Sequence, residues 1–349
     1  MKKVLSLLLV AMLLLAGAAF AEGKVGVAMP TQDLQRWNQD GANMKAQLEE
    51  AGYEVILTYS GNDVARQVSD IENMILNEVD VLVVASIDGS ALGTVLSQAK
   101  DEGIPVIAYD RLLTDTDAVD YYATFDNYMV GTIQGTYIEE RFDLANTTET
   151  YTMEMFGGSP DDNNAYYFFN GAWDVLKPYV DAGTLVIPSG QTDFETIAIL
   201  GWGSDDAQAR MDNLLTAYYS DGVAPDIILS PNDSLALGVT NSLQAAGFTL
   251  EEFPVITGQD CDVTNVKNII AGYQAMSVFK DTRTLASQVV KMVDAILKGE
   301  EVPVNDTETY DNGVKVVPSY LCEPVFADAS NYEELLVDSG YYTAEQLAE

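Results

Sequence analysis

Strand-like and helix-like segments alternate along nearly the whole of this chain, with short connections between them. Short apolar runs such as 81–85 and 227–230 are typical of buried parallel strands, and the intervening segments have helical periodicity. This alternation indicates βαβ units, whose right-handed crossovers place helices on both faces of a parallel sheet. The series starts again after residue 127, and 349 residues exceed one ordinary core. The sequence therefore predicts an α/β fold with two lobes of similar size.

The expected elements are these. Strands are predicted at 25–29, 54–59, 81–85, 105–109, 120–124, 151–156, 184–187, 226–229, 254–257 and 274–279. Helices are predicted at 38–51, 63–77, 90–102, 128–142, 164–179, 205–220, 233–246, 263–271 and 281–298. Residues 307–320 are expected to form a late hairpin around the turn 311–313, and the acidic tail with Tyr341 and Tyr342 is expected to be peripheral.

The first 21 residues have the pattern of a secretory signal. Lys2 and Lys3 precede an apolar run at 4–16, and small residues at 19 and 21 predict cleavage before Glu22. The apolar run is too short to span a bilayer. Position 18 is Ala where a lipoprotein signal would need Cys. We therefore expect a soluble periplasmic protein without a lipid anchor.

Charge and composition restrict the function. The chain has 17 basic and 54 acidic residues, a net charge of −37, which disfavours nucleic acid and anionic membranes as partners. It has no histidine, so the usual general base and the commonest zinc ligand are missing, and we predict no metal or other cofactor. Cys261 and Cys322 could form a disulfide or stay as two separate thiols, and the sequence leaves both alternatives open.

Polar side chains follow the predicted strands where each strand ends. Asp110 and Arg111 follow the apolar run 104–109, and carboxyl ends of parallel strands form the ligand-binding edge of open α/β sheets. Charged acceptors and donors bond sugar hydroxyls strongly, while aromatic rings cover the apolar sugar faces. The candidates are Arg36, Trp37, Asp110, Arg111, Asn163, Asn164, Trp202, Asn232, Asp233, Asp260 and Lys280.

Each candidate also has a purely structural explanation. An Asp or Asn just after a strand is commonly a helix N-cap, which applies to Asp233 and Asn163. Arg36 could be a solvated surface charge, and a lone Trp commonly belongs to a core. Asp161 and Asp162 are explained as charges at a helix start. Repetition of the pattern in both halves is what favours a binding site.

At these residues the chain closely resembles periplasmic monosaccharide-binding proteins of ABC importers, in the xylose-binding and multiple-sugar-binding branch. The segments that carry the resemblance are 36–37, 108–111, 123–127, 156–165, 207–213, 230–233, 257–260 and 305–320. The resemblance implies a type I periplasmic binding protein fold, with two Rossmann-like lobes joined by a three-stranded hinge. It places residues 22–126 and 281–308 in the N-terminal lobe, and 127–280 and 309–349 in the C-terminal lobe.

The resemblance also implies the site and the partners. The residues that it assigns to sugar binding are Arg36, Trp37, Asp110, Arg111, Asn164, Trp202, Asn232, Asp260 and Lys280. Cys261 departs from the family pattern, which has a small residue such as Ala after Gly-Gln-Asp, so pocket shape or redox sensitivity would differ. The expected function is hinge closure around an aldopyranose (xylose, glucose, galactose or arabinose type) by a monomer that an ABC permease then recognises. Presentation of the sugar to a chemoreceptor or sensor kinase is the alternative.

Two other functions, glycoside hydrolysis and transcriptional regulation, fit the sequence less well. A glycosidase needs two carboxylates across a sugar, and Asp110 with Asp260 would supply them. Arg111 is adjacent to Asp110, and the resemblance places Lys280 near the same site, so these cations would keep the carboxylates ionised, which disfavours a proton donor. A transcriptional regulator would need an N-terminal DNA-binding motif where this chain has a signal sequence. We therefore expect a binding protein that is not an enzyme, and the sequence leaves the identity of the sugar open.

Overall fold

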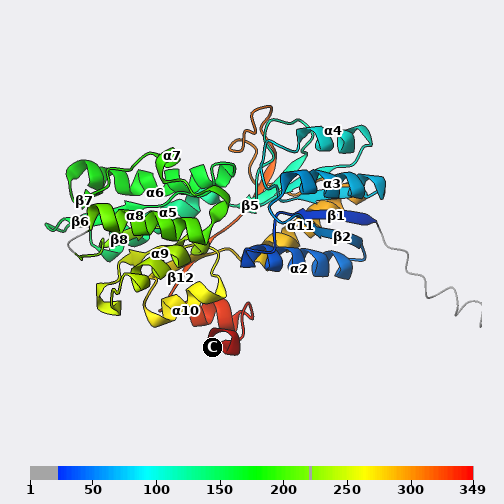
Figure 1. The fold of residues 1–349 in the computed structure, drawn as a ribbon. Coiled ribbons are helices and arrows are strands. Elements are labelled where there is room, and N and C mark those ends of the chain that lie inside the picture. Colours follow the sequence, from blue (N-terminus) through cyan, green and yellow to red (C-terminus); the bar gives the residue numbers. More distant parts are fainter. Residues whose placement is uncertain (1–22, 220–221, 349) are drawn as a thin grey trace, which may run out of the picture.

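The computed structural model describes residues 23–219 and 222–348 (Figure 1). The predicted signal sequence and its cleavage site lie outside the described residues. Within the described ranges, no helix combines the length and the apolar character that crossing a membrane requires. The elements gather around two larger parallel sheets that lie side by side, and we call the parts built on them the first and second lobes.

The first lobe contains a six-stranded, entirely parallel sheet in the order β11-β5-β4-β3-β1-β2. Its strands are β1 (Lys24–Met29), β2 (Glu54–Tyr59), β3 (Val81–Val84), β4 (Val106–Tyr109), β5 (Tyr121–Phe125) and β11 (Ser319–Cys322). Its helices are α2 (Gln35–Glu50), α3 (Val64–Leu76), α4 (Gly93–Asp101) and α11 (Thr282–Lys298).

Alternating side chains of β1 separate the two cores of the first lobe. Val25 and Val27 pack into the cluster formed with α2 and α11, whereas Ala28 faces the cluster formed with α3 and α4. This period of two is expected of a strand covered on both faces. Both faces of such a strand are buried, so its consecutive residues are all apolar. This continuous apolar run is the sequence pattern from which the strands were predicted.

The second lobe contains a four-stranded parallel sheet in the order β7-β6-β8-β9 and a two-stranded antiparallel pair, β10-β12. Its strands are β6 (Tyr151–Met155), β7 (Leu185–Val186), β8 (Ile227–Leu229), β9 (Val255–Ile256), β10 (Met276–Phe279) and β12 (Val325–Asp328). Its helical segments are α5 (Asn127–Arg141), α6 (Asn163–Ala182), α7 (Phe194–Ile197), η1 (Leu200–Trp202), α8 (Ser204–Tyr218), α9 (Asp233–Ala245), η2 (Leu250–Glu252), α10 (Val263–Ala271), η3 (Glu333–Asp338) and α12 (Ala344–Ala348).

Three stretches of chain pass between the lobes. They are the junction of β5 with α5, the junction of β10 with α11, and the link from β11 to β12. The predicted fold class, two lobes with parallel sheets and a three-stranded connection, is confirmed by this arrangement. Helices and strands alternate in each lobe as predicted, because the apolar periodicities that define them are local properties of the sequence.

Two expectations for the last part of the chain need correction. Residues 309–322 were assigned to the second lobe, but β11 pairs with β5 and Tyr310 and Val317 are buried in the first lobe. The expected hairpin at 307–320 is reduced to isolated bridges, Asp306 with Ser319 and Asp311 with Val316. Pairing with β5 takes up the backbone groups of β11 and adds a sixth strand to the first sheet.

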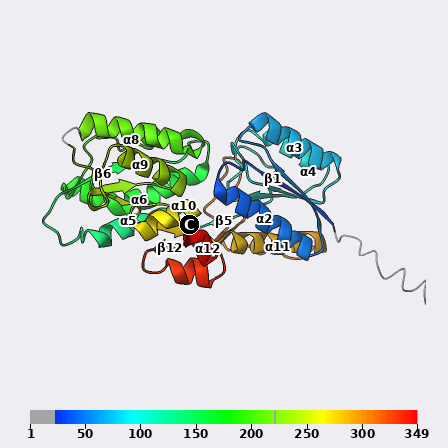
Figure 2. The same ribbon diagram turned by 60° about the horizontal axis from the view of Figure 1, so that its bottom comes forward.

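The tail was expected to be peripheral, and this is also wrong. Tyr342 and Leu347 are buried in a cluster with Cys261, Phe279 and Leu336. In Figure 2 the tail segment with α12 lies beside α10 and near the crossing between the lobes. The prediction relied on the acidic composition of the tail and overlooked its few apolar residues, which pack against the second lobe.

Candidate functional site

A pocket lies between the two lobes, at the carboxyl ends of strands from both sheets. The first lobe lines it with Leu34, Arg36, Trp37, Asp110 and Arg111. The remaining lining residues are Asp162, Asn164, Phe168, Trp202, Asn232, Ser234, Gln259, Asp260, Asp262 and, at the crossing after β10, Lys280. The pocket therefore has the position that open α/β sheets give to ligands.

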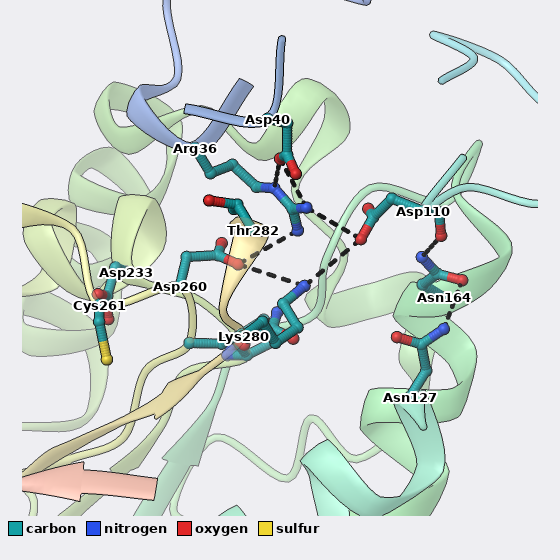
Figure 3. Close-up of polar contacts among 12 residues, drawn as sticks. Arg36, Asp40, Asp110, Asn127, Asn164, Asp233, Asp260, Cys261, Lys280 and Thr282 are labelled. Carbon is teal, nitrogen blue, oxygen red and sulfur yellow. Dashed lines mark hydrogen bonds and ion pairs between the residues drawn. The ribbon is translucent and has the colours of Figure 1, made fainter. Parts of the chain in front are cut away.

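Arg36, at the start of α2, joins carboxylates of both lobes (Figure 3). Its Nη2 atom lies 3.1 Å from Oδ1 of Asp110, and its Nη1 atom lies 3.4 Å from Oδ1 of Asp260. Its Nε atom donates to Asp40, one helical turn away, at 2.9 Å. The spacing of four along α2 places Asp40 behind the guanidinium, where it holds the side chain aimed into the pocket.

Lys280 makes a second bridge between the same two carboxylates. Its Nζ atom lies 3.2 Å from Oδ1 of Asp260 and 3.8 Å from Oδ1 of Asp110. The ammonium also lies above the rings of Phe125 and Phe168, at 5.9 and 5.6 Å from their centres. Figure 3 shows Arg36 and Lys280 on either side of the two acids. Two cations and two anions therefore neutralise one another at the centre of the pocket.

These charges set the protonation of the carboxyl groups. Burial alone would raise the pKa of Asp110, but Arg36, Lys280 and Arg111 together lower it below its ordinary value. Asp40 differs, because burial raises its pKa to about 6 in spite of Arg36. Asp110 is therefore an ionised hydrogen-bond acceptor near neutral pH and is poorly suited to donate a proton as a general acid.

The backbone of Asp110 is held by residues from both lobes. Its φ of 59° is unusual for a residue other than glycine, and its carbonyl accepts hydrogen bonds from the Tyr122 hydroxyl at 2.6 Å and from Nδ2 of Asn164 at 2.7 Å. Oδ1 of Asn164 in turn accepts from Tyr122 and from Asn127, each at 3.0 Å. Asn164 lines the pocket as predicted, yet its amide is occupied in fastening α6 to the Asp110 turn.

Arg111 makes a second ion pair across the lobes. Its Nε atom lies 3.0 Å from Oδ2 of Asp162, and its Nη1 atom donates to the carbonyls of Ser86 and Ile87. Asp162 also caps α6 by accepting from the amide of Asn164. The structural explanation of Asp162 as a helix-start charge is therefore correct, and the pairing with Arg111 adds a role that only the approach of the lobes reveals.

Aromatic rings cover the pocket walls. Trp37 lies beneath both arginines, with the guanidinium carbons of Arg36 and Arg111 at 4.6 and 5.1 Å from its ring centre. Trp202 packs edge-on against Phe168 with ring centres 6.2 Å apart. The indole nitrogens of both tryptophans are buried without a hydrogen-bond partner among the described residues. Both residues line the pocket, and a buried donor without a partner is uncommon in folded proteins.

Cys261 and Asp233 lie behind the pocket wall. The thiol of Cys261 is buried, does not line the pocket, and lies 3.7 Å from the carbonyl oxygen of Ser277. Both cysteines are free thiols, so the disulfide alternative is not realised. Asp233 begins α9, and its carboxylate accepts from the Asp262 amide and from the Ser277 hydroxyl. The residue that departs from the family pattern at position 261 therefore lies outside the pocket lining, next to the Asp260 that belongs to it.

All nine residues predicted to bind sugar line this one pocket. Asn232 additionally caps α9 by accepting from the amide of Leu235. That these side chains contact a sugar stays a prediction. Sequence reasoning missed Asp262, Gln259 and Phe168, although Gln259 and Asp262 flank the predicted Asp260 and proximity alone could have indicated them. Within residues 23–219 and 222–348, no cluster of Cys, Asp or Glu side chains is arranged to hold a metal ion.

The partly buried Asp262 should make the stability of the protein depend on pH. Burial and the nearby Asp260 raise the pKa of Asp262 from 3.8 to about 7. Between pH 4 and 7 the folded chain therefore holds a proton that the unfolded chain releases, so the free energy of unfolding falls as pH rises through this window. We expect Asp262→Asn to lose less stability than the wild type between pH 4.5 and 7.5 in urea unfolding.

The control for that experiment is Asp205→Asn, at an exposed aspartate in the first turn of α8. It should retain the pH dependence of the wild type. Identical pH dependence in Asp262→Asn and the wild type would contradict the assignment of the raised pKa to Asp262.

The comparisons with known proteins agree with this geometry. The model of the periplasmic binding protein domain matches residues 25–301, and the chain belongs to this family. Structures with bound sugar share its type I fold. The predicted membership of the xylose-binding and multiple-sugar-binding branch is confirmed by the individual relatives that follow.

The multiple sugar-binding periplasmic receptor ChvE of Rhizobium radiobacter is 50% identical over 340 residues, covering 97% of this chain and 96% of the relative. The D-xylose-binding periplasmic protein of Escherichia coli K12 is 35% identical over 347 residues, covering 99% of each chain. A solved ABC transporter solute binding protein from Clostridium phytofermentans, with bound β-D-glucose, is 64% identical. Its TM-score is 0.91, and the match covers 93% of this chain and 99% of that one.

Proposed function

We propose that this protein is the substrate-binding component of a sugar ABC importer and encloses one aldopyranose between its lobes. The observation that carries the proposal is the interlobe pocket, where Arg36 and Lys280 each reach both Asp110 and Asp260. Contacts from both lobes are required for a ligand to favour the closed form, because a ligand shifts an equilibrium only by its differential affinity for the two states. The bound glucose in the solute binding protein that is 64% identical supports the sugar class.

The proposal includes the compartment, the partners and the moving units. The relatives named as periplasmic support a periplasmic location. The name of the ABC transporter solute binding protein supports an ABC permease as the membrane partner, and we propose a monomer as the working form. Among the described residues, the two moving bodies are 23–126 with 281–322, and 127–280 with 323–348, since β11 belongs to the first sheet. The comparisons do not favour a sensory role, by way of a chemoreceptor or sensor kinase, over transport.

We propose that the protein binds sugar without converting it. The relatives are named as binding proteins and receptors. In the pocket, Arg36, Lys280 and Arg111 lower the pKa of Asp110 below its ordinary value, which favours the ionised form of that acid. A glycosidase would need one of the two carboxyl groups to be protonated. Appearance of product from an aryl glycoside would contradict this part of the proposal.

The first test is a thermal-shift and calorimetric screen of residues 22–349 against pentoses, hexoses and disaccharides. A ligand that binds only the folded form raises the melting temperature with its concentration. We expect one or a few aldopyranoses, glucose and xylose among those tested, to bind at 1:1 stoichiometry. Absence of any shift with every monosaccharide would contradict the proposed function.

A further inference from the structure

The C-terminal tail is anchored on the second lobe but reaches the first. β12 pairs with β10, and the following segment buries Leu336, Tyr342 and Leu347 against the second lobe. Tyr341, beside Tyr342, lies 3.2 Å from the hydroxyl of Thr282 at the start of α11 in the first lobe. Figure 2 shows this segment next to the crossing between the lobes, on the side of α2 and α10. The tail therefore spans the boundary that must open to admit a ligand.

The hydroxyl of Tyr342 makes three hydrogen bonds that connect the lobes. It donates to the carbonyl of Cys261 at 2.9 Å, and it accepts from Nε2 of Gln35 at 2.8 Å and from Nε2 of Gln39 at 3.0 Å. Both glutamines lie on α2 of the first lobe, and Cys261 belongs to the second. Oε1 of Gln35 also accepts from the amide of Val263 at 3.2 Å. One donor and two acceptor positions saturate the hydroxyl, whose residue is 3% exposed.

The carbonyl that Tyr342 holds belongs to a strained turn next to the pocket. Asp260 and Cys261 have φ values of 94° and 52°, which residues with a side chain adopt only when their surroundings impose them. The amide of Cys261 donates to the Ser277 hydroxyl at 3.0 Å. The Tyr342 hydroxyl donates a hydrogen bond to the carbonyl oxygen of Cys261. The two contacts fix the turn that carries the Asp260 carboxylate into the pocket.

We infer that Tyr342 is a positioning residue that latches the lobes together and orients Asp260 for the ligand. This inference rests on the proposed function. In the closed form Gln35 and Gln39 reach the tail, and in an open form the lobes carry them away from it. Loss of the hydroxyl therefore destabilises the closed form relative to the open form. The ligand then dissociates faster, while its entry into the open form is unchanged.

Tyr342→Phe removes the hydroxyl and keeps the ring. We expect the affinity for the aldopyranose found in the screen to fall about tenfold, equivalent to about 1.4 kcal/mol. Stopped-flow fluorescence should place the loss in the dissociation rate, with the association rate unchanged. The matched control is Tyr332→Phe, on the same tail, where the hydroxyl contacts only its exposed neighbour Glu333 at 3.2 Å among the described residues. Tyr332→Phe should bind as the wild type does.

A double-mutant cycle distinguishes two explanations of the Tyr342→Phe effect: loss of a hydrogen bond across the lobes, which is the latch, and looser packing of the tail. Gln39→Ala removes one of the two partners on α2, and Tyr342→Phe removes the hydroxyl that accepts from it. If the two groups act through one bond across the lobes, the losses of affinity are smaller together than their sum, and Gln39→Ala leaves the melting temperature of the ligand-free protein unchanged. Strictly additive losses, or a lower ligand-free melting temperature with unchanged affinity in Tyr342→Phe, would overturn the latch.

The two proposals fail in different ways. Absence of monosaccharide binding by the wild type overturns both the proposed function and the latch. Normal binding by the wild type together with equal affinity and dissociation rate in Tyr342→Phe overturns the latch alone.

Discussion

Asp110→Ala should weaken sugar binding by at least 30-fold, about 2 kcal/mol or more, as measured by isothermal titration calorimetry. Truncation of one member of a buried, hydrogen-bonded charge pair costs about 2–5 kcal/mol, because the remaining charge is left buried without its partner. Here two cations depend on the same carboxylate: Arg36 at 3.1 Å and Lys280 at 3.8 Å. In the closed form Asp260 would be the only remaining carboxylate that Arg36 and Lys280 share, so most of the loss should fall on the closed, ligand-bound form.

Asp117→Ala is the matched control, since it removes an aspartate of the same lobe that also pairs with a lysine. Nζ of Lys100 lies 2.6 Å from Oδ2 of Asp117, but both side chains are more than half exposed, at 51% and 61%. Exposed pairs contribute about 0–1 kcal/mol. The control variant should therefore bind sugar with unchanged affinity, and equal losses in the two variants would refute the role of Asp110.

Gly158→Ala should also abolish most of the binding, by moving Trp202. A Cβ atom at position 158 would lie 2.0 Å from the Trp202 ring, which no real contact allows. Trp202 is 4% exposed and packs against Phe168, so its ring has no free space to enter without disturbing the pocket wall. We expect at least a tenfold loss of affinity and a lower melting temperature, measured by calorimetry and thermal unfolding.

Two variants test this explanation. Gly93→Ala places a Cβ atom in α4 with its nearest neighbours at 4.0 Å, so it should change neither affinity nor melting temperature. Adding Trp202→Phe to Gly158→Ala makes room for the new methyl group. The double variant should regain thermal stability while still lacking the indole ring that faces the pocket, so its affinity should stay low. Full recovery of affinity would show that the ring of Trp202 does not contact the ligand.

The closed arrangement depends on several interlobe contacts of different kinds. Arg111 pairs with Asp162 at 3.0 Å, Asn164 holds the Asp110 carbonyl, and Tyr342 connects α2 with the Cys261 turn. Each of these contacts lies at or beside the pocket and connects a residue of the first lobe with a residue of the second, and opening of the lobes would separate the two residues. In the open form, water solvates these groups. The affinity for a ligand therefore depends on the difference in free energy between the closed, ligand-bound form and the open, solvated form.

Local sequence patterns were sufficient to predict most of the strands, helices and candidate pocket residues. The apolar runs that end at Tyr109 and at Leu229 are buried strands, because residues covered on both faces need apolar side chains whatever the rest of the chain does. Asp110 and Arg111 follow the first of these strands directly, and Asn232 lies three residues after the second, so their place at the pocket edge is a consequence of chain order.

The sequence by itself determined the α/β fold class, the two lobes and the edge at which polar side chains gather, since these follow from periodicity and from residues adjacent in the chain. Only the tertiary structure decided that β11 joins the first sheet, that Asp162 pairs with Arg111, and that Tyr342 is buried between the lobes. The pairing of Arg111 with Asp162 and the contacts of Tyr342 depend on how the two lobes face each other. They join residues as far apart as Gln35 and Tyr342, and no periodicity of a single segment encodes such an approach.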